Sequence, residues 1–340
     1  MNEALLQVRN LNVVFGQGDQ QVKAVSNVSF SVGAGEILGL VGESGSGKST
    51  IGRALLRLVP AASGEVLWRG RGVLDLPAGP MRALRSQMQM VFQDASLNPR
   101  QRVGSMIEEV LSLHTTLDRA GRRAQMQALL ARVGLRGDQA ERYPHEFSGG
   151  QKQRLGIARA LAAKPAFIIA DEPVSALDVS IQAQVLNLLS DLQRELGLTM
   201  LFISHDLDVV EHLCDRVVVL YLGRVMEIAT KKDLFEAPAH PYTVGLLKAA
   251  PVADPMAPEP EITLQGEPPS PLAPPSGCVF RTRCPHARSI CAQEIPPLRA
   301  LAGGRSVACV RLEEIAQEPL TAAALGAPPV ESACSPRETV

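Results

Sequence analysis

Nine consecutive residues, Gly42-Glu43-Ser44-Gly45-Ser46-Gly47-Lys48-Ser49-Thr50, combine glycines, hydroxyls and one lysine in a spacing that suits a phosphate. Glycines permit sharp turns that aim successive backbone N–H groups at an anion. Lys48 can reach the β- and γ-phosphates, and the Ser49 hydroxyl can ligate Mg²⁺. The loop lies between an apolar strand predicted at 37–41 and a helix predicted at 51–58, and that helix adds its positive dipole end. This context favours a P-loop that binds a nucleoside triphosphate over a plain glycine turn.

Two adjacent acids follow the apolar run Phe167-Ile168-Ile169-Ala170, which predicts a second buried strand. The end of such a strand would deliver Asp171 beside the P-loop, where it can hold Mg²⁺ directly or through water. Glu172 would then polarise a water against the γ-phosphate as a general base. Paired acids after a strand are often only a helix N-cap cluster, and the upstream P-loop makes that alternative the less favoured one.

A second glycine turn, Ser148-Gly149-Gly150-Gln151, opens a helix predicted over 152–162. It would again present backbone N–H groups and a hydroxyl to an anion at a helix N-terminus. One nucleotide needs only one cradle of this kind. We therefore expect this turn to contact the γ-phosphate held by the P-loop of another subunit.

In these motifs the chain resembles the ATP-binding cassette (ABC) ATPases, over about Leu5 to Lys248. The family signature is Leu-Ser-Gly-Gly-Gln, and here Phe147 takes the leucine position. The resemblance implies that Gln93 senses Mg²⁺ or the attacking water and that His205 contacts the γ-phosphate. It also implies that Asp178, in Ser175-Ala176-Leu177-Asp178, crosses a dimer interface, and that Phe15 stacks on adenine. By themselves Gln93, His205 and Phe15 would be a strand-end polar residue and two core residues.

The elements that must position these residues predict an α/β fold. Apolar runs at 166–171, 199–204 and 216–221 alternate with helical segments, which indicates a mostly parallel sheet. Short runs of apolar and β-branched residues from Leu5 to Phe30 and at 64–68 predict an antiparallel β-subdomain. A similar run at 88–93 predicts a further strand. Helical spacing at 105–113 and 119–133 predicts a helical subdomain at about 94–165. We expect an ATP-binding domain at 1–250, a proline-rich linker at 251–277, a cysteine-bearing segment at 278–316 and a disordered tail at 317–340.

The composition of the 340-residue chain limits its class. Hydrophobic residues make up 46% and charged residues 20%, as in a globular protein with a core. The net charge of −1 and 4% aromatics give no bulk attraction for nucleic acid. Met1-Asn2-Glu3 lacks a basic start, and the longest apolar runs are too short to span a bilayer. We expect a cytoplasmic protein that meets the membrane only through partners.

Four of the six cysteines, Cys278, Cys284, Cys291 and Cys309, lie in one short proline-flanked segment. In a cytoplasmic protein such a group indicates metal or redox chemistry before disulfides, and four thiols suit a tetrathiolate site. Buried structural cysteines are the alternative, which we expect for Cys214. Cys334 receives no role. The chemistry of the thiols leaves zinc and an iron–sulfur cluster both open.

Residues 239–243 and the four cysteines resemble the C-terminal extension of ATPases in dipeptide and oligopeptide permeases. Residues 174–189 and 96–100 resemble the same group, and the sequence resembles the F-type ATPase of that group more than the D-type ATPase. The resemblance implies a [4Fe–4S] cluster, with zinc as the alternative. It also implies a second ABC ATPase subunit, two transmembrane permease subunits that dock on the helical insertion, and an extracytoplasmic peptide-binding protein. The complex would place this chain at the cytoplasmic face of the bacterial inner membrane.

Three other functions use similar motifs. ABC ATPases of DNA repair carry a long coiled coil between the P-loop and the signature, and here about a hundred residues without sustained heptads intervene. Translation factors of the family carry two cassettes in one chain, and this chain has one. An importer of nickel, glutathione or antimicrobial peptides stays open, because substrate choice lies in other subunits.

Overall fold

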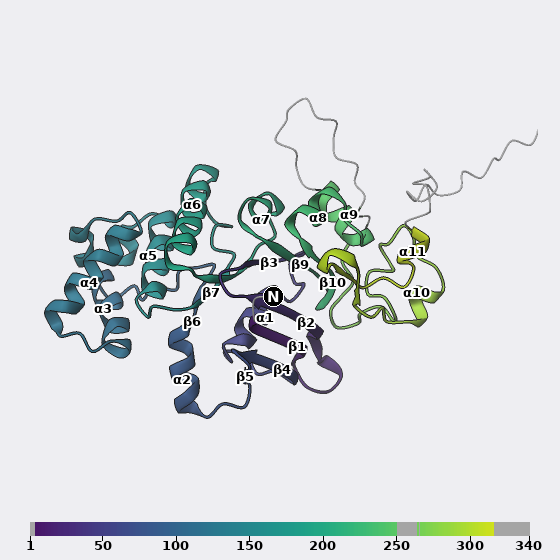
Figure 1. The fold of residues 1–340 in the computed structure, drawn as a ribbon, viewed down its shortest axis with the longest axis horizontal. Coiled ribbons are helices and arrows are strands. Elements are labelled where there is room, and N and C mark those ends of the chain that lie inside the picture. Colours follow the sequence, from purple (N-terminus) through teal and green to yellow (C-terminus); the bar gives the residue numbers. More distant parts are fainter. Residues whose placement is uncertain (1–3, 250–263, 265, 316–340) are drawn as a thin grey trace, which may run out of the picture.

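A mixed eight-stranded sheet forms the centre of the computed structural model, which describes residues 4–249, 264 and 266–315. The strand order is β11-β12-β10-β9-β3-β8-β7-β6 (Figure 1). Strands β9, β3, β8, β7 and β6 run parallel, whereas β10, β12 and β11 continue the sheet antiparallel. The strands are β3 (Ile37–Val41), β6 (Met88–Val91), β7 (Phe167–Asp171), β8 (Thr199–Ile203), β9 (Arg216–Tyr221), β10 (Arg224–Thr230), β11 (Arg299–Ala300) and β12 (Ser306–Val307).

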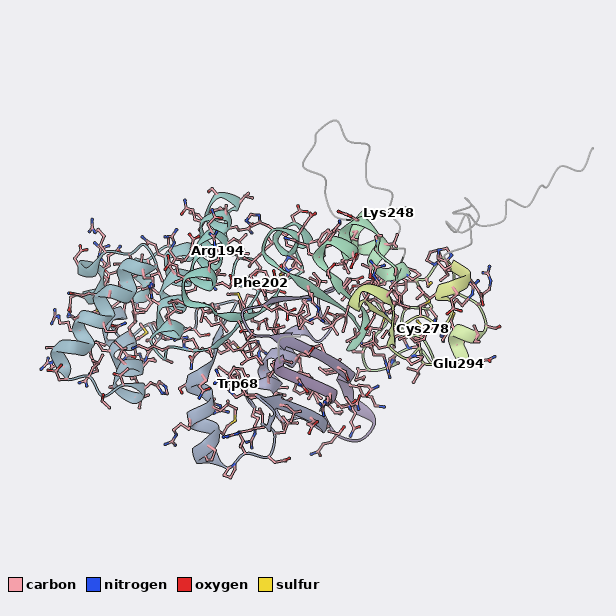
Figure 2. The ribbon with its side chains drawn as sticks, in the orientation of Figure 1. Trp68, Arg194, Phe202, Lys248, Cys278 and Glu294 are labelled. Atoms are coloured by element: carbon pink, nitrogen blue, oxygen red, sulfur yellow. The ribbon has the colours of Figure 1, made fainter. Side chains whose placement is uncertain are left out.

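The central strands are apolar throughout because both faces of the sheet are covered. All five residues of β3, β7 and β8 are buried, as expected for a parallel sheet between two layers. Alternate residues enter different cores: Leu201 and Ile203 pack with the antiparallel sheet, whereas Met200 and Phe202 pack with the helices. Figure 2 shows Phe202 in the middle of the molecule.

The second sheet is antiparallel, with the order β2-β1-β4-β5. It consists of β1 (Ala4–Phe15), β2 (Val22–Gly33), β4 (Ser63–Trp68) and β5 (Arg71–Gly72). Its buried face forms one core with α1 (Lys48–Leu55), α2 (Ala78–Gln87) and one face of the central sheet. Helix α1 is therefore enclosed between the two sheets, which fixes the loop that precedes it.

A helical group occupies one end of the molecule (Figure 1). It is built from α3 (Val103–His114), α4 (Arg119–Arg132) and α5 (Gly149–Leu161), with α6 (Val179–Leu196) alongside. The buried face of α4 carries Met126, Leu129 and Leu130, so the helical spacing predicted at 119–133 is confirmed. These helices share a core with the second face of the central sheet.

The cysteine-bearing segment lies at the opposite end of the molecule, where Figure 2 marks Cys278. Its strands β12 and β11 extend the central sheet, because Ser306 and Val307 pair with Ile228 and Glu227 of β10. The remaining helices are α7 (Leu207–Leu213), α8 (Lys231–Glu236), α9 (Pro241–Lys248), α10 (Ile290–Gln293) and α11 (Leu312–Ile315). Most of the predicted linker (251–263 and 265) and the predicted tail (317–340) lie outside the described residues.

The predicted fold class is confirmed: a P-loop α/β core with an antiparallel sheet and a group of helices. Helix α1 begins at Lys48, where the positive dipole end is expected beside the glycine loop, and ends at Leu55, three residues before the predicted end at 58. Of the helices in the described part of the chain, none has the length and apolar content that a bilayer crossing requires.

Candidate nucleotide-binding site

The P-loop connects β3 to α1 through a turn that only glycines permit at three positions. Gly42, Gly45 and Gly47 have φ angles of 147°, 76° and 98°, a region that side chains with a Cβ rarely adopt. A Cβ on Gly42 would lie 2.1 Å from the Leu220 carbonyl oxygen, and one on Gly47 would lie 2.4 Å from that of Ala24. The loop therefore closes against the backbone of β9 and β2, as a phosphate cradle requires.

Lys48 is the first residue of α1, and its side chain folds back over the loop. Its Nζ donates hydrogen bonds to the carbonyl oxygens of Gly42 (2.6 Å) and Glu43 (3.0 Å). Burial lowers the pKa of the Lys48 ammonium, whereas the charges of Glu172, Asp171 and Glu43 oppose that shift. The three carboxylates keep the buried Lys48 ammonium charged, and that cation is the group in the loop that can attract a phosphate.

Ser49 and Asp171 meet as the sequence predicts. The Ser49 hydroxyl donates to Asp171 Oδ1 at 2.6 Å, across 122 residues of sequence. Burial raises the pKa of the Asp171 carboxyl, and the hydrogen bond from Ser49 and the Arg53 charge act in the opposite direction. Two oxygen donors side by side at the edge of a phosphate loop fit Mg²⁺, which takes one or two protein ligands and completes its shell with phosphates and water.

Glu172 is the centre of a second polar cluster. It follows β7 with a φ of 46°, and its backbone N–H donates to the Ile203 carbonyl oxygen of β8 at 3.0 Å. Its carboxylate Oε2 accepts from Gln93 Nε2 at 3.3 Å and lies 3.3 Å from His205 Nδ1. The structure thus brings together three residues, from the ends of β6, β7 and β8, that the sequence links only through a family resemblance.

Three other predicted residues lie around the loop. The Ser46 side chain is buried, and its Oγ has no hydrogen-bond partner among the described residues. Thr50 lies in the first turn of α1. Phe15 ends β1 with 42% of its surface exposed, so its ring is free to stack on a base. An orphaned buried hydroxyl in a phosphate loop fits a bound phosphate oxygen.

The side chains of Ser148 and Gln151 cap the start of α5 by hydrogen bonds within the turn. Ser148 Oγ accepts from the Gln151 N–H at 3.4 Å, and Gln151 Oε1 accepts from the Ser148 N–H at 3.1 Å, which forms a capping box. A Cβ on Gly150 would lie 2.3 Å from Ile181 Cγ2, and one on Gly149 would lie 3.3 Å from Leu177 Cδ2. The turn therefore packs against the loop that contains Asp178, the residue that precedes α6.

Two residues of the C-terminal region touch the P-loop, and motif reading assigned a role to neither. Arg283 Nη1 donates to both carboxylate oxygens of Glu43 at 2.9 Å, and the Tyr242 hydroxyl accepts from the Glu43 N–H at 3.1 Å. Their positions lie about 200 to 240 residues from Glu43, so no local spacing indicates these contacts. In the sequence, Arg283 is marked only by its position next to Cys284.

The four predicted ligand cysteines line one cavity together with Phe280 and Arg311. Burial raises the pKa of the Cys284 thiol to about 12, and the neighbouring thiols add to the effect. Burial likewise raises the pKa of Cys278 and Cys309. Across the described residues, however, no group of three or more His, Cys, Asp or Glu side chains could hold a metal ion. Cys214 is buried beside Gly39, so its predicted core role is confirmed.

Comparison with known proteins agrees with this geometry. Residues 25–175 match the family model described as "ABC transporter", and residues 226–291 match "Oligopeptide/dipeptide transporter, C-terminal region". The chain is 54% identical over 309 residues to the "Putative peptide import ATP-binding protein" of Brucella ovis, covering 90% of this chain and 98% of that protein. It is 53% identical over 293 residues to the oligopeptide transport ATP-binding protein AppF of Bacillus subtilis, covering 85% and 89%.

Among solved structures, the ATP-binding cassette MJ0796, in a dimeric post-hydrolysis state bound to ADP and Pi, superposes with a TM-score of 0.62. The two are 30% identical, and the match covers 66% of this chain and 98% of that one. The second family model ends at residue 291 and so reaches the cysteine-bearing segment in part. On these matches and on the geometry of its phosphate loop, the chain belongs to the ATP-hydrolysing ABC transporter proteins of the oligopeptide/dipeptide type.

Proposed function

We propose that this chain is the ATP-hydrolysing subunit of an importer that carries oligopeptides or dipeptides across the cytoplasmic membrane. The observation that carries the proposal is the convergence of Ser49, Asp171 and Glu172 beside a P-loop, in a chain whose relatives are named for peptide import. The closer resemblance to an F-type ATPase stays a prediction.

The placement of the site residues supports the roles that we propose for them. Lys48 would leave the carbonyl oxygens that it now contacts and neutralise the β- and γ-phosphates. Mg²⁺, held by Ser49 and Asp171, would neutralise phosphate charge. Glu172 would accept a proton from the attacking water, with Gln93 and His205 holding its carboxylate in place.

We also propose that the working unit is a pair of ATPase chains, in which each Ser148 turn completes the P-loop site of the other. Ser148, Gly149 and Asp178 are exposed, and next to them Val179, an apolar residue, is 82% exposed. An apolar side chain beside polar groups that have no distant partner suits a surface that a second chain covers. The solved cassette with 30% identity is itself described as dimeric.

The further partners follow from the importer class. Two transmembrane permease subunits would dock on the helical group of α3 to α5, and a peptide-binding protein outside the membrane would deliver the substrate. The chain would then sit peripherally at the inner face of the membrane, held there by the permeases. We expect the partner ATPase to be a related chain and not a second copy.

For the four cysteines we propose a structural [4Fe–4S] cluster, with zinc as the alternative. Their shared cavity supports the proposal, because the four thiols line one space, where metal binding would replace the thiol protons. Their placement in this structure does not form a metal site, so loading would require the sulfurs to move closer. Iron and acid-labile sulfide analysis of anaerobically purified protein decides the point: zinc without iron, or no metal, would reject the cluster.

Uptake by intact cells tests the transport function. Cells whose only copy carries Lys48→Ala should lose accumulation of a radiolabelled tripeptide while free amino acid uptake is unchanged. Uptake of nickel and of glutathione, measured in the same cells, separates the related importers. Unchanged tripeptide uptake together with loss of nickel or glutathione uptake would overturn the peptide assignment and leave the ATPase assignment intact.

A further inference from the structure

The C-terminal region holds the phosphate loop through a nearly buried ion pair. Arg283 Nη1 contacts both oxygens of the Glu43 carboxylate at 2.9 Å. The two side chains are 7% and 23% exposed, so little water screens their charges. Arg283 is the residue immediately before Cys284, and Glu43 is the second residue of the P-loop.

A cluster of aromatic rings packs against Arg283 beside the loop. The rings of Tyr221, Tyr242 and Phe280 are fully buried, with centroids 4.7 to 5.3 Å apart. Arg283 lies over the Tyr221 ring at 5.8 Å and donates to its hydroxyl at 3.4 Å. The three rings come from β9, α9 and the cysteine segment, so one cluster joins the central sheet to the extension.

Glu43 is consequently held by its side chain and by both of its backbone groups. Its carboxylate accepts from Arg283, its backbone N–H donates to the Tyr242 hydroxyl, and its carbonyl oxygen accepts from Lys48 and from the Ser46 N–H. Lys48 is expected to leave when a phosphate binds, and the described anchors of Glu43 from outside the loop, Tyr242 and Arg283, both come from beyond residue 240. Gly45 of the loop also lines one cavity together with Pro274 and Pro275, which places this part of the C-terminal region beside the loop.

We propose that Arg283 and Tyr242 are positioning residues for nucleotide binding, and that through them the cysteine-bearing extension sets the ATP affinity of the P-loop. Arg283 neutralises and immobilises the Glu43 carboxylate. Without Arg283 that carboxylate would stay beside the loop as an uncompensated negative charge, free to pair with Lys48 and to repel the triphosphate. The proposal concerns nucleotide affinity and does not depend on which solute is imported.

Linkage makes the coupling reciprocal: if the extension favours nucleotide binding, bound nucleotide must stabilise the extension by the same free energy. Hydrogen exchange can detect this. Backbone amides of 278–291 should exchange more slowly when ADP occupies the P-loop, although none of the described contacts of this segment is with the Ser49–Asp171 pair.

The test measures ADP and ATP affinity calorimetrically on the full chain, with Arg283→Met as the main variant. ADP reports the single-chain site without dimer closure. We expect about tenfold weaker binding of both nucleotides, with partial recovery in Arg283→Lys, which keeps the charge and loses the two-oxygen contact. The matched control is Arg281→Met, two residues away, whose described side-chain hydrogen bonds go to Ser276. The nucleotide affinity of this control should equal that of the wild type.

A double-mutant cycle separates positioning from a general structural defect. In a Glu43→Gln background the Arg283→Met change should weaken ADP binding less than about twofold, because the charge to be neutralised is gone. This background also keeps the test valid if Arg283→Met alone folds poorly. Wild-type affinity in a folded Arg283→Met chain, an equal loss in Arg281→Met, or an unchanged penalty with Glu43→Gln would each overturn the proposal.

Discussion

The two glycine turns of this chain both open a helix, yet glycine serves a different purpose in each. In the P-loop, positive φ angles at Gly42, Gly45 and Gly47 shape the backbone. In the Ser148 turn, Gly150 lies within the helix, and its missing side chain lets Ile181 approach to 2.3 Å of a would-be Cβ. The first turn is a cradle, and the second is a close contact between two elements.

The partners of the two turns differ in the same way. Around the P-loop, Ser49 reaches Asp171 and Glu43 reaches Arg283, both across more than a hundred residues. Among the described residues, the side chains of Ser148 and Gln151 hydrogen-bond only within the Ser148 turn. This difference in partners is the physical basis for proposing a paired ATPase.

Glu172→Gln should have the largest effect. The amide cannot take a proton from water, so we expect hydrolysis to fall about 10²- to 10⁴-fold. ATP affinity should persist, because the P-loop is untouched, and an ATP-dependent dimer should accumulate. Steady-state hydrolysis and size-exclusion chromatography with ATP measure both effects. Turnover at the wild-type rate would remove Glu172 from its assigned role.

Ser148→Ala should separate the turns. Losing one donor to the γ-phosphate should slow hydrolysis about 10²-fold, while ADP affinity of the single chain stays unchanged. The variant also loses a helix cap, so Asp118→Ala is the matched control: Asp118 Oδ1 caps α4 by accepting from the Gly121 N–H at 2.8 Å. The control should lose similar stability and no activity. Weaker ADP binding in Ser148→Ala would place the turn at its own chain's nucleotide.

Gly47→Ala should weaken nucleotide binding, whereas Gly150→Ala should slow ATP hydrolysis. The first puts a Cβ 2.4 Å from the Ala24 carbonyl oxygen in a left-handed conformation, which costs about 1–2 kcal/mol before any clash. ADP affinity should therefore fall about tenfold. The second pushes on the movable Ile181 side chain, so ADP affinity should hold while hydrolysis falls. Equal loss of ADP binding in both variants would contradict the distinction.

The smallest expected effect is a loss of folding stability at acid pH, through His240 beside Tyr242. His240 is buried, its Nδ1 accepts from the Tyr242 N–H at 3.0 Å, and burial lowers its pKa from 6.5 to about 4. The unfolded chain then binds more protons than the folded one between these values, so stability falls as pH drops from 6.5 to 4. We expect a loss of about 1.4 kcal/mol at pH 5.5.

Urea unfolding at pH 7.5 and 5.5 measures this loss. His240→Asn keeps an acceptor at the start of α9 and removes the titrating group, so its stability should lose this part of the pH dependence. If the free energy of unfolding changed with pH in His240→Asn as it does in the wild type, groups other than His240 would control the pH dependence.

Local patterns predicted much of the fold and of the site. Runs of apolar residues indicated β3, β7, β8 and β9, since a strand covered on both faces must be apolar throughout. The P-loop, the Asp171-Glu172 pair and the Ser148 turn each consist of adjacent residues, so the sequence alone is enough to recognise them.

Other features had no local signal. Helix α2 contains Gly79 and Pro80 and buries only Met81 and Leu84, so its periodicity is weak. Strands β11 and β12 have two residues each, too few for any alternation. The Arg283–Glu43 pair is set by tertiary folding across 240 residues, which no spacing rule reaches.

The pairing of β12 with β10 bears on how far this protein can be divided. Strand β10 is buried along most of its length, and beneath the junction the fully buried Glu227 faces Arg305 at 3.6 Å. A cassette trimmed after residue 250 would expose a bare strand edge able to recruit other chains into aggregates, and would strand a carboxylate without its counter-ion. Chimaeras that exchange tails between relatives should therefore retain residues 299–307 together with β10.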